Sequence, residues 1–128
     1  MRDNHTCDAV GVLRFLWDKF DANTATDEEL EFLSCATDEA TTISHSVADE
    51  LFGIAVFVGG ERQAGRQVEK INGIDLPVAL INLSQTMRMV GELTFIGSEA
   101  SFEERKRSEA KLKSRRVERA KQSEREDA

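Results

Sequence analysis

The sequence predicts an all-α protein, a long antiparallel helical hairpin with a short N-terminal helix before it and a charged helical tail after it. Two stretches, residues 27–58 and 76–96, repeat apolar residues about every 3.5 positions, the period of helices that pack along one another. The turn dipeptide Asn72-Gly73 lies between them. Only 6 of the last 28 residues are apolar. We therefore expect one helical domain over residues 1–100 and a partly solvated tail over residues 101–128.

The N-terminal helix is expected over about residues 8–20. Its apolar residues are spaced by three and four positions and so share one helical face: Val10, Leu13, Trp17 and Phe20. Trp17 is the only tryptophan of the chain and lies within this face. We expect its side chain to be largely buried.

A capping box marks the start of the first long helix, because Thr26 can cap an early N–H while the Glu29 carboxylate reaches back. Gly59-Gly60 is the expected end. The run 54–58 would also suit a buried strand, but the helical period continues into it unchanged, so we favour a helix. The apolar stripe consists of Leu30, Leu33, Ala36, Ala40, Ile43, Val47, Leu51, Ile54 and Val58.

Residues 61–76 admit two interpretations, helix or strand. Asn72-Gly73 favours a two-residue β-hairpin that pairs residues 68–71 with residues 74–76. The sequence alone leaves both interpretations open for residues 68–76.

The second long helix is expected to begin at Pro77, the only proline, with Asp75 placed to cap it. We expect it to end near Gly97. A second capping box, formed by Ser101 and Glu104, is expected to start the separate helix of the tail. The stripe of the second long helix consists of Leu76, Leu80, Leu83, Met87 and Val90.

One hairpin cannot cover all of this apolar surface. Residues 51–58 are apolar almost all round the helix, and much of residues 78–83 is as well. A monomer with two long helices covers only one side of each. We therefore expect a homodimer that completes a four-helix or larger bundle.

Charge is distributed unevenly along the chain, with a net charge of −9 over residues 1–60. The acidic residues lie off the apolar stripe, which is typical of a solvated face. The sharper interpretation is an acidic surface that docks a basic partner or imitates nucleic acid. The candidate docking residues are Asp27, Glu28, Glu31, Asp38, Glu39, Asp49 and Glu50.

The tail contains a basic run over residues 105–121, with nine bases and two acids. A solubilising tail is the plain interpretation, and contact with nucleic acid or an acidic protein surface is the alternative. No aromatic residue is interleaved for base stacking, so tight duplex binding is not expected. The candidate polyanion contacts are Arg105, Lys106, Arg107, Lys111, Lys113, Arg115, Arg116, Arg119 and Lys121.

The sequence lacks the patterns of metal-dependent and nucleophilic catalysis. Cys35 and His45 lie ten residues apart on one expected helix, about 15 Å along its axis, which is too far for one zinc ion. His5 and Cys7 alone leave two ligands missing. There is no phosphate-binding glycine loop and no nucleophile elbow. We therefore expect no enzyme, no cofactor and no metal.

The longest almost unbroken apolar run, residues 51–58, is shorter than the roughly 20 residues of a membrane helix. The first residues show no apolar signal segment. We expect no membrane contact and a cytoplasmic location, with both cysteines reduced.

These features together predict a non-catalytic protein–protein interaction module, a small helical adaptor, regulator or inhibitor that acts by surface occlusion. By analogy, compact acidic proteins without a catalytic site are often accessory factors of phages and mobile elements. The alternative function is a nucleic-acid-associated regulator that uses the basic C-terminal helix. The expected partners are a second copy of the chain and another protein, with nucleic acid bound only weakly.

Overall fold

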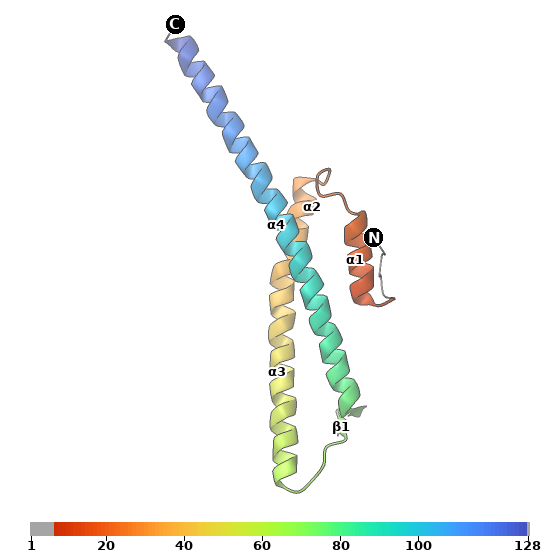
Figure 1. The fold of residues 1–128 in the computed structure, drawn as a ribbon. Helices are drawn as coiled ribbons and strands as arrows, with labels where there is room; N and C mark the ends of the chain where they lie inside the picture. The colour runs from red at the N-terminus through yellow and green to blue at the C-terminus, as the bar shows by residue number, and fades with distance from the viewer. Residues whose placement is uncertain (1–6, 128) are drawn as a thin grey trace.

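The computed structural model describes residues 7–127 and confirms the all-α helical hairpin. A long helix, α4, packs antiparallel along α3 and continues past α2 to the projecting C-terminus (Figure 1). The elements are α1 (Ala9–Lys19), α2 (Asp27–Ser34), α3 (Ala36–Gln63), β1 (Lys70–Ile71), β2 (Ile74–Asp75) and α4 (Leu76–Glu126).

Side-chain caps fix the first two helices. Asp8 accepts a 2.7 Å hydrogen bond from the Gly11 N–H at the start of α1. The predicted capping box of α2 is confirmed. The Glu29 N–H donates to the Thr26 hydroxyl at 3.1 Å, and the Thr26 N–H donates to the Glu29 carboxylate at 2.8 Å.

The first long helix differs from the prediction at both ends. It is broken at Cys35 into α2 and α3, next to the place where Thr37 lies against Gly97 of α4. It also passes through Gly59-Gly60, because a glycine pair is tolerated inside a helix at some cost. The helix ends at Gln63, and Gly65 follows with φ +76°, the left-handed conformation that glycine adopts easily.

The structure distinguishes helix from strand in the two segments for which the sequence allows both. Residues 54–58 are helical, as favoured, and the β-hairpin interpretation holds for residues 70–75. Lys70 pairs with Asp75 and Ile71 with Ile74. Both residues of the turn between the strands, Asn72 and Gly73, have positive φ, as this tight turn requires.

The second long helix and the tail form one helix of 51 residues, about 75 Å long. The predictions of an end near Gly97 and of a new helix start at Ser101 are therefore wrong. Gly97 is buried in the contact with α3, so the glycine provides room for packing and does not end the helix. Pro77 lies in the first turn as predicted, whereas Asp75 makes no side-chain capping bond.

The core consists of two small clusters. Leu30 and Ala100, both fully buried, join Ala25 where α2 meets α4. Val47, Ile54 and Leu83 form the second cluster between α3 and α4. Other members of the predicted stripes stay partly open, as described below.

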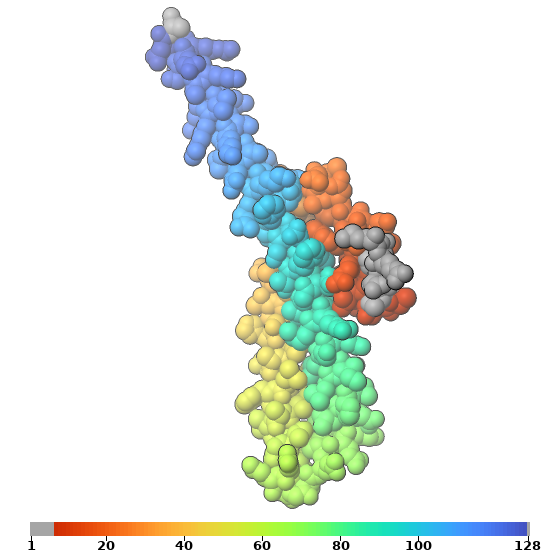
Figure 2. All heavy atoms as spheres, viewed as in Figure 1, coloured from red at the N-terminus to blue at the C-terminus, as the bar shows by residue number. Residues whose placement is uncertain are grey.

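The molecule therefore exposes much more surface than its mass predicts. Its accessible surface is 10168 Å², whereas a compact monomer of 14.3 kDa exposes about 6800 Å². The long shape and the lobe formed by α1 are visible in Figure 2. The projecting end of α4 accounts for part of the excess, and open apolar faces account for the rest.

Candidate interaction surfaces

An apolar groove of about 310 Å³ lies between α1, α2 and α4. Leu16 and Trp17 line it from α1, Phe32 and Leu33 from α2, and Ile96 from α4. The Phe32 side chain is 78% exposed and Leu16 is 58% exposed. Large apolar side chains thus surround a space that solvent can enter, which is typical of a binding groove.

Aromatic contacts and one ion pair hold α1 in place along this groove. The Trp17 ring stacks on Phe20 with a centroid distance of 5.4 Å. It also meets the edge of Phe95 on α4 at 6.3 Å. Arg14 pairs with Glu92, and the hydrogen bond from this pair raises the pKa of Arg14. These contacts secure α1 on one side and leave its groove side open.

Trp17 is therefore half-buried, although the sequence predicts a largely buried side chain. The reason is geometric. α1 packs against α4 through a short face, and no described element covers the other side of the indole ring.

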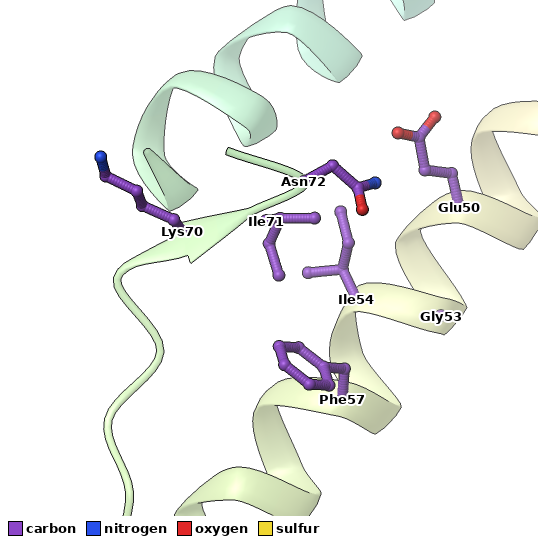
Figure 3. Close-up of a pocket in the computed structure, with 7 residues that line it drawn as sticks. All are labelled: Glu50, Gly53, Ile54, Phe57, Lys70, Ile71 and Asn72. Carbon is purple, nitrogen blue, oxygen red and sulfur yellow. The ribbon is translucent and has the colours of Figure 1, made fainter. Parts of the chain in front are cut away.

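A second hollow of about 420 Å³ lies beside the β-hairpin. In Figure 3, Ile71 of β1 and Ile54 of α3 point toward one another, with Phe57 next to them. Glu50 and Lys70 lie on opposite sides of the hollow. Because Ile54 and Ile71 belong to the hairpin core, we interpret this hollow as the open end of that core.

All seven candidate acidic residues are exposed, but they do not form one compact site. Asp38 and Asp49 lie eleven residues apart on one line of α3, and Glu39 and Glu50 lie on the next line. Asp27 is engaged by the tail. The remaining two acids, Glu28 and Glu31, are on α2.

Two of the nine candidate basic residues hold the fold together. Arg107 donates to the carbonyl oxygens of Ala25 at 2.7 Å and Ala22 at 2.8 Å, and to the Asp27 carboxylate at 3.1 Å. Lys111 donates to Asp27 at 2.8 Å. The tail thus clasps the turn before α2, and no local sequence pattern predicts this contact because the partners are 80 or more residues apart.

Hydrogen bonds from Lys111 and then Arg107 lower the pKa of Asp27. The folded-state pKa lies below the unfolded value, so this contact stabilises the protein above the unfolded pKa of about 3.9. The contribution is lost as the pH falls through the lowered folded-state pKa.

The other bases project into solvent. Every described residue after Arg107 is exposed. Lys106 makes an ion pair with Glu103 at 3.5 Å. The remaining six are Arg105, Lys113, Arg115, Arg116, Arg119 and Lys121, and at about 100° per residue all but Lys121 lie within roughly 160° of the helix circumference.

Replacing Arg107 by alanine is expected to lower the free energy of unfolding by about 2 kcal/mol, because carbonyl groups in the turn before α2 lose a charged donor. Urea unfolding monitored by circular dichroism measures this loss. Arg115→Ala, in the exposed part of α4, is the matched control and should change stability by less than about 0.5 kcal/mol. Equal stability of the two variants would contradict the clasp.

The described cysteines and histidine that were candidates for metal binding do not form a cluster. Cys7 and Cys35 are free and exposed, and His45 is exposed on α3. Among residues 7–127 no group of three or more His, Cys, Asp or Glu side chains could hold a metal ion. His5 lies outside the described residues.

The helical run Asp27–Gln63 is long and apolar enough to cross a membrane by length and composition, with a mean hydropathy of 1.2 over 18 residues. This run is longer than the nearly unbroken apolar stretch of residues 51–58 on which the prediction of no membrane contact rests. Only 11% of this window is buried in the protein. Lipid and protein are therefore the two neighbours to be distinguished for α3.

No protein-family model, curated protein or solved structure matches this chain. The candidate site consequently rests on its geometry. The sequence predicts Trp17 on the N-terminal helix but does not identify Phe32 as its neighbour across the groove. The available signal was that Phe32 lies off the apolar stripe of its helix.

Proposed function

We propose that this protein is a non-catalytic interaction protein whose α1–α2 groove binds an amphipathic helix of a protein partner. The observation that carries the proposal is the aromatic lining around Trp17 and Phe32, which is open to solvent. Helix-in-groove recognition uses such a surface, because apolar residues at i, i+3, i+4 and i+7 of the bound helix can enter it together.

Charge around the groove favours a basic partner helix. Glu29 lines the groove, and Glu28 lies four residues before Phe32 and thus on the same side of α2. A partner helix with an apolar face flanked by Lys or Arg would therefore match the groove in both hydrophobicity and charge.

The arrangement suits a protein that acts by occupying a surface. α2 is fixed to α4 by Leu30 and by the Arg107 clasp, so one wall of the groove is rigid. α1 forms the other wall and is held against α4 by the Arg14–Glu92 pair and by the contact of Trp17 with Phe95. The bound segment would be withdrawn from its other partners, which is inhibition or regulation by occlusion.

Titration with a synthetic amphipathic peptide tests this proposal, with Leu at i, i+3, i+4 and i+7 and Lys elsewhere. Trp17 is the only tryptophan and lines the groove, so its fluorescence reports occupancy. We expect a saturable blue shift. A matched peptide with Glu in place of Lys should bind at least about tenfold more weakly.

The substitution Phe32→Ser distinguishes binding in the groove from non-specific hydrophobic binding of the peptide. The side chain is 78% exposed, so the fold should survive, while affinity for the Lys peptide should fall at least about tenfold. Phe52→Ser is the matched control, because Phe52 is 73% exposed on α3 outside the groove. Unchanged Trp17 fluorescence with the Lys peptide, or equal effects of the two substitutions, would overturn the proposal.

The alternative, a nucleic-acid regulator that uses the basic helix, has less support. Arg107 and Lys111 are engaged within the fold, and no aromatic residue for base stacking lies among the bases of residues 105–121. Deletion of residues 112–128 should leave peptide binding unchanged. A variant that folds but loses peptide binding would move the function into the tail.

A further inference from the structure

Except for Arg62 in the last turn of α3, one side of the hairpin consists of uncharged residues from both long helices. At about 100° per residue, Leu51 lies about 40° from the buried Val47 on α3. Met87 and Leu80 lie about 60–80° from the buried Val90 on α4, in the same rotational sense. Because α3 and α4 run antiparallel, the same rotational sense brings Leu51 of α3 and Leu80 and Met87 of α4 to the same side of the hairpin. We call this side the open face.

The half-exposed residues of the open face are the alternate members of the predicted apolar stripes. Leu51 is 41% exposed, Leu80 42% and Met87 39%, whereas Val47 and Val90 are buried. In a complete four-helix bundle both sets would be buried. The remaining positions of the face are small or uncharged: Ser44, Ala48, Ala55, Ser84, Gly91 and Thr94.

The opposite side of the hairpin carries charged residues and is partly covered by another element. It carries Glu39 and Glu50 on α3. At one end β1 lies over it, with Ile71 packed against the hairpin core (Figure 3). α1 packs elsewhere, against Phe95 on the outer side of α4. The open face is thus the long side of the hairpin that has no cover, and its one charged side chain is Arg62, in the last turn of α3.

We infer that the open face binds a second copy of this chain, and that the two hairpins form a four-helix bundle. Leu51, Leu80 and Met87 of each copy would enter the shared core. Small residues at Ala48, Ala55 and Gly91 would allow close approach of the helices. A two-fold axis makes such a face complementary to itself, since each residue meets the corresponding surface of the other copy.

The size of the open face agrees with this occupant. From Leu80 to Ser98 it is about 27 Å long, and two helices are about 20 Å wide. The flat area of the open face is therefore roughly 500–600 Å². Protruding side chains add to the accessible area that it can bury, which brings it toward the roughly 800 Å² per partner of a standard stable interface.

A membrane is the less favoured occupant. Asp49 and Glu50 lie midway along α3, within the run long enough to span a membrane. α4 packs along that run and carries Arg88 and Glu92, so a spanning hairpin would bring charged side chains into lipid. A second copy covers only the open face and leaves these groups in water.

Sedimentation equilibrium of the full chain at micromolar concentration tests the inference. We expect a mass of twice 14.3 kDa for the native sequence. Met87→Glu and Leu80→Glu each place a carboxylate in the shared core from both copies, so the dissociation constant should rise at least about 100-fold. Val117→Glu, at a 53% exposed position of the tail, is the control and should remain dimeric.

The outcomes are distinct. A native chain that stays at 14.3 kDa, or a dimer that both glutamate variants leave intact, would overturn the inference. Circular dichroism verifies that the variants stay helical. A monomer that floats with phosphatidylcholine vesicles would assign the face to lipid instead. The α1–α2 groove is separate from the open face. Failure of peptide binding would therefore contradict only the proposed function, and failure of dimerisation would contradict only this inference.

Discussion

Replacing Gly97 by alanine is expected to destabilise the protein by about 3 kcal/mol. A Cβ atom added at Gly97 would collide with the Thr37 hydroxyl and would lie 2.6 Å from the Thr37 backbone nitrogen. The obstacle includes backbone, so a side-chain rotation cannot relieve it. α3 and α4 must separate at this contact, and the packing around it loosens.

Gly53→Ala is the matched control for this substitution, because a Cβ there meets nothing within 4 Å. Alanine is the better helix former, so the control should gain up to about 1 kcal/mol. Thermal and urea unfolding measure both changes. The packing account would be contradicted if the two alanine substitutions shifted stability in the same direction.

Val47→Asp is expected to cost about 4 kcal/mol or more at neutral pH and to unfold much of the population. Val47 is 4% exposed and packs in the cluster with Ile54 and Leu83, where a carboxylate finds no partner. Val56→Asp, on the same helix at a 59% exposed position, is the control and should change stability by less than about 1 kcal/mol.

The pH dependence of Val47→Asp has a defined sign. Burial raises the folded-state pKa of a carboxyl group above its unfolded value of about 3.9. The part of the penalty that comes from burying a charge is therefore full above the raised pKa and disappears as the pH falls toward the unfolded value, while the cost of replacing valine by a neutral polar side chain remains. Urea unfolding between pH 7 and pH 4 should show the variant approaching the native chain. A difference independent of pH would contradict burial at this position.

Local patterns predicted most of the fold. The spacing of apolar residues identified α1 and the two long helices, and Asn72-Gly73 identified the β-hairpin, because each signal lies within a few residues. Among the expected core residues of α3, Val47 and Ile54 are buried. These predictions needed no knowledge of distant contacts.

Features that depend on distant contacts were missed. The break at Cys35 and the passage of α4 through Gly97 both arise where two helices cross, more than 50 residues apart in sequence. The clasp by Arg107 is equally remote from its partners. Stop and start signals at Gly97 and Ser101 are locally sound, but burial against α2 and α3 outweighs them.

The candidate site shows the same division. The sequence supplied Trp17 and its helical face, but the groove needs Phe32 from another helix. It also supplied the stripe residues Leu80 and Met87, and a stripe alone does not show which members one hairpin leaves open. That distinction follows from how α3 and α4 pack.

Hydroxyl-radical footprinting of Met87 tests most directly the claim that the open face is a contact surface. Met87 is 39% exposed, and Met89, two residues later, lies on another side of α4 and serves as the internal reference. As protein concentration increases through the range of assembly, oxidation of Met87 should fall several-fold while that of Met89 stays constant. Oxidation of Met87 that does not change with concentration would contradict the account.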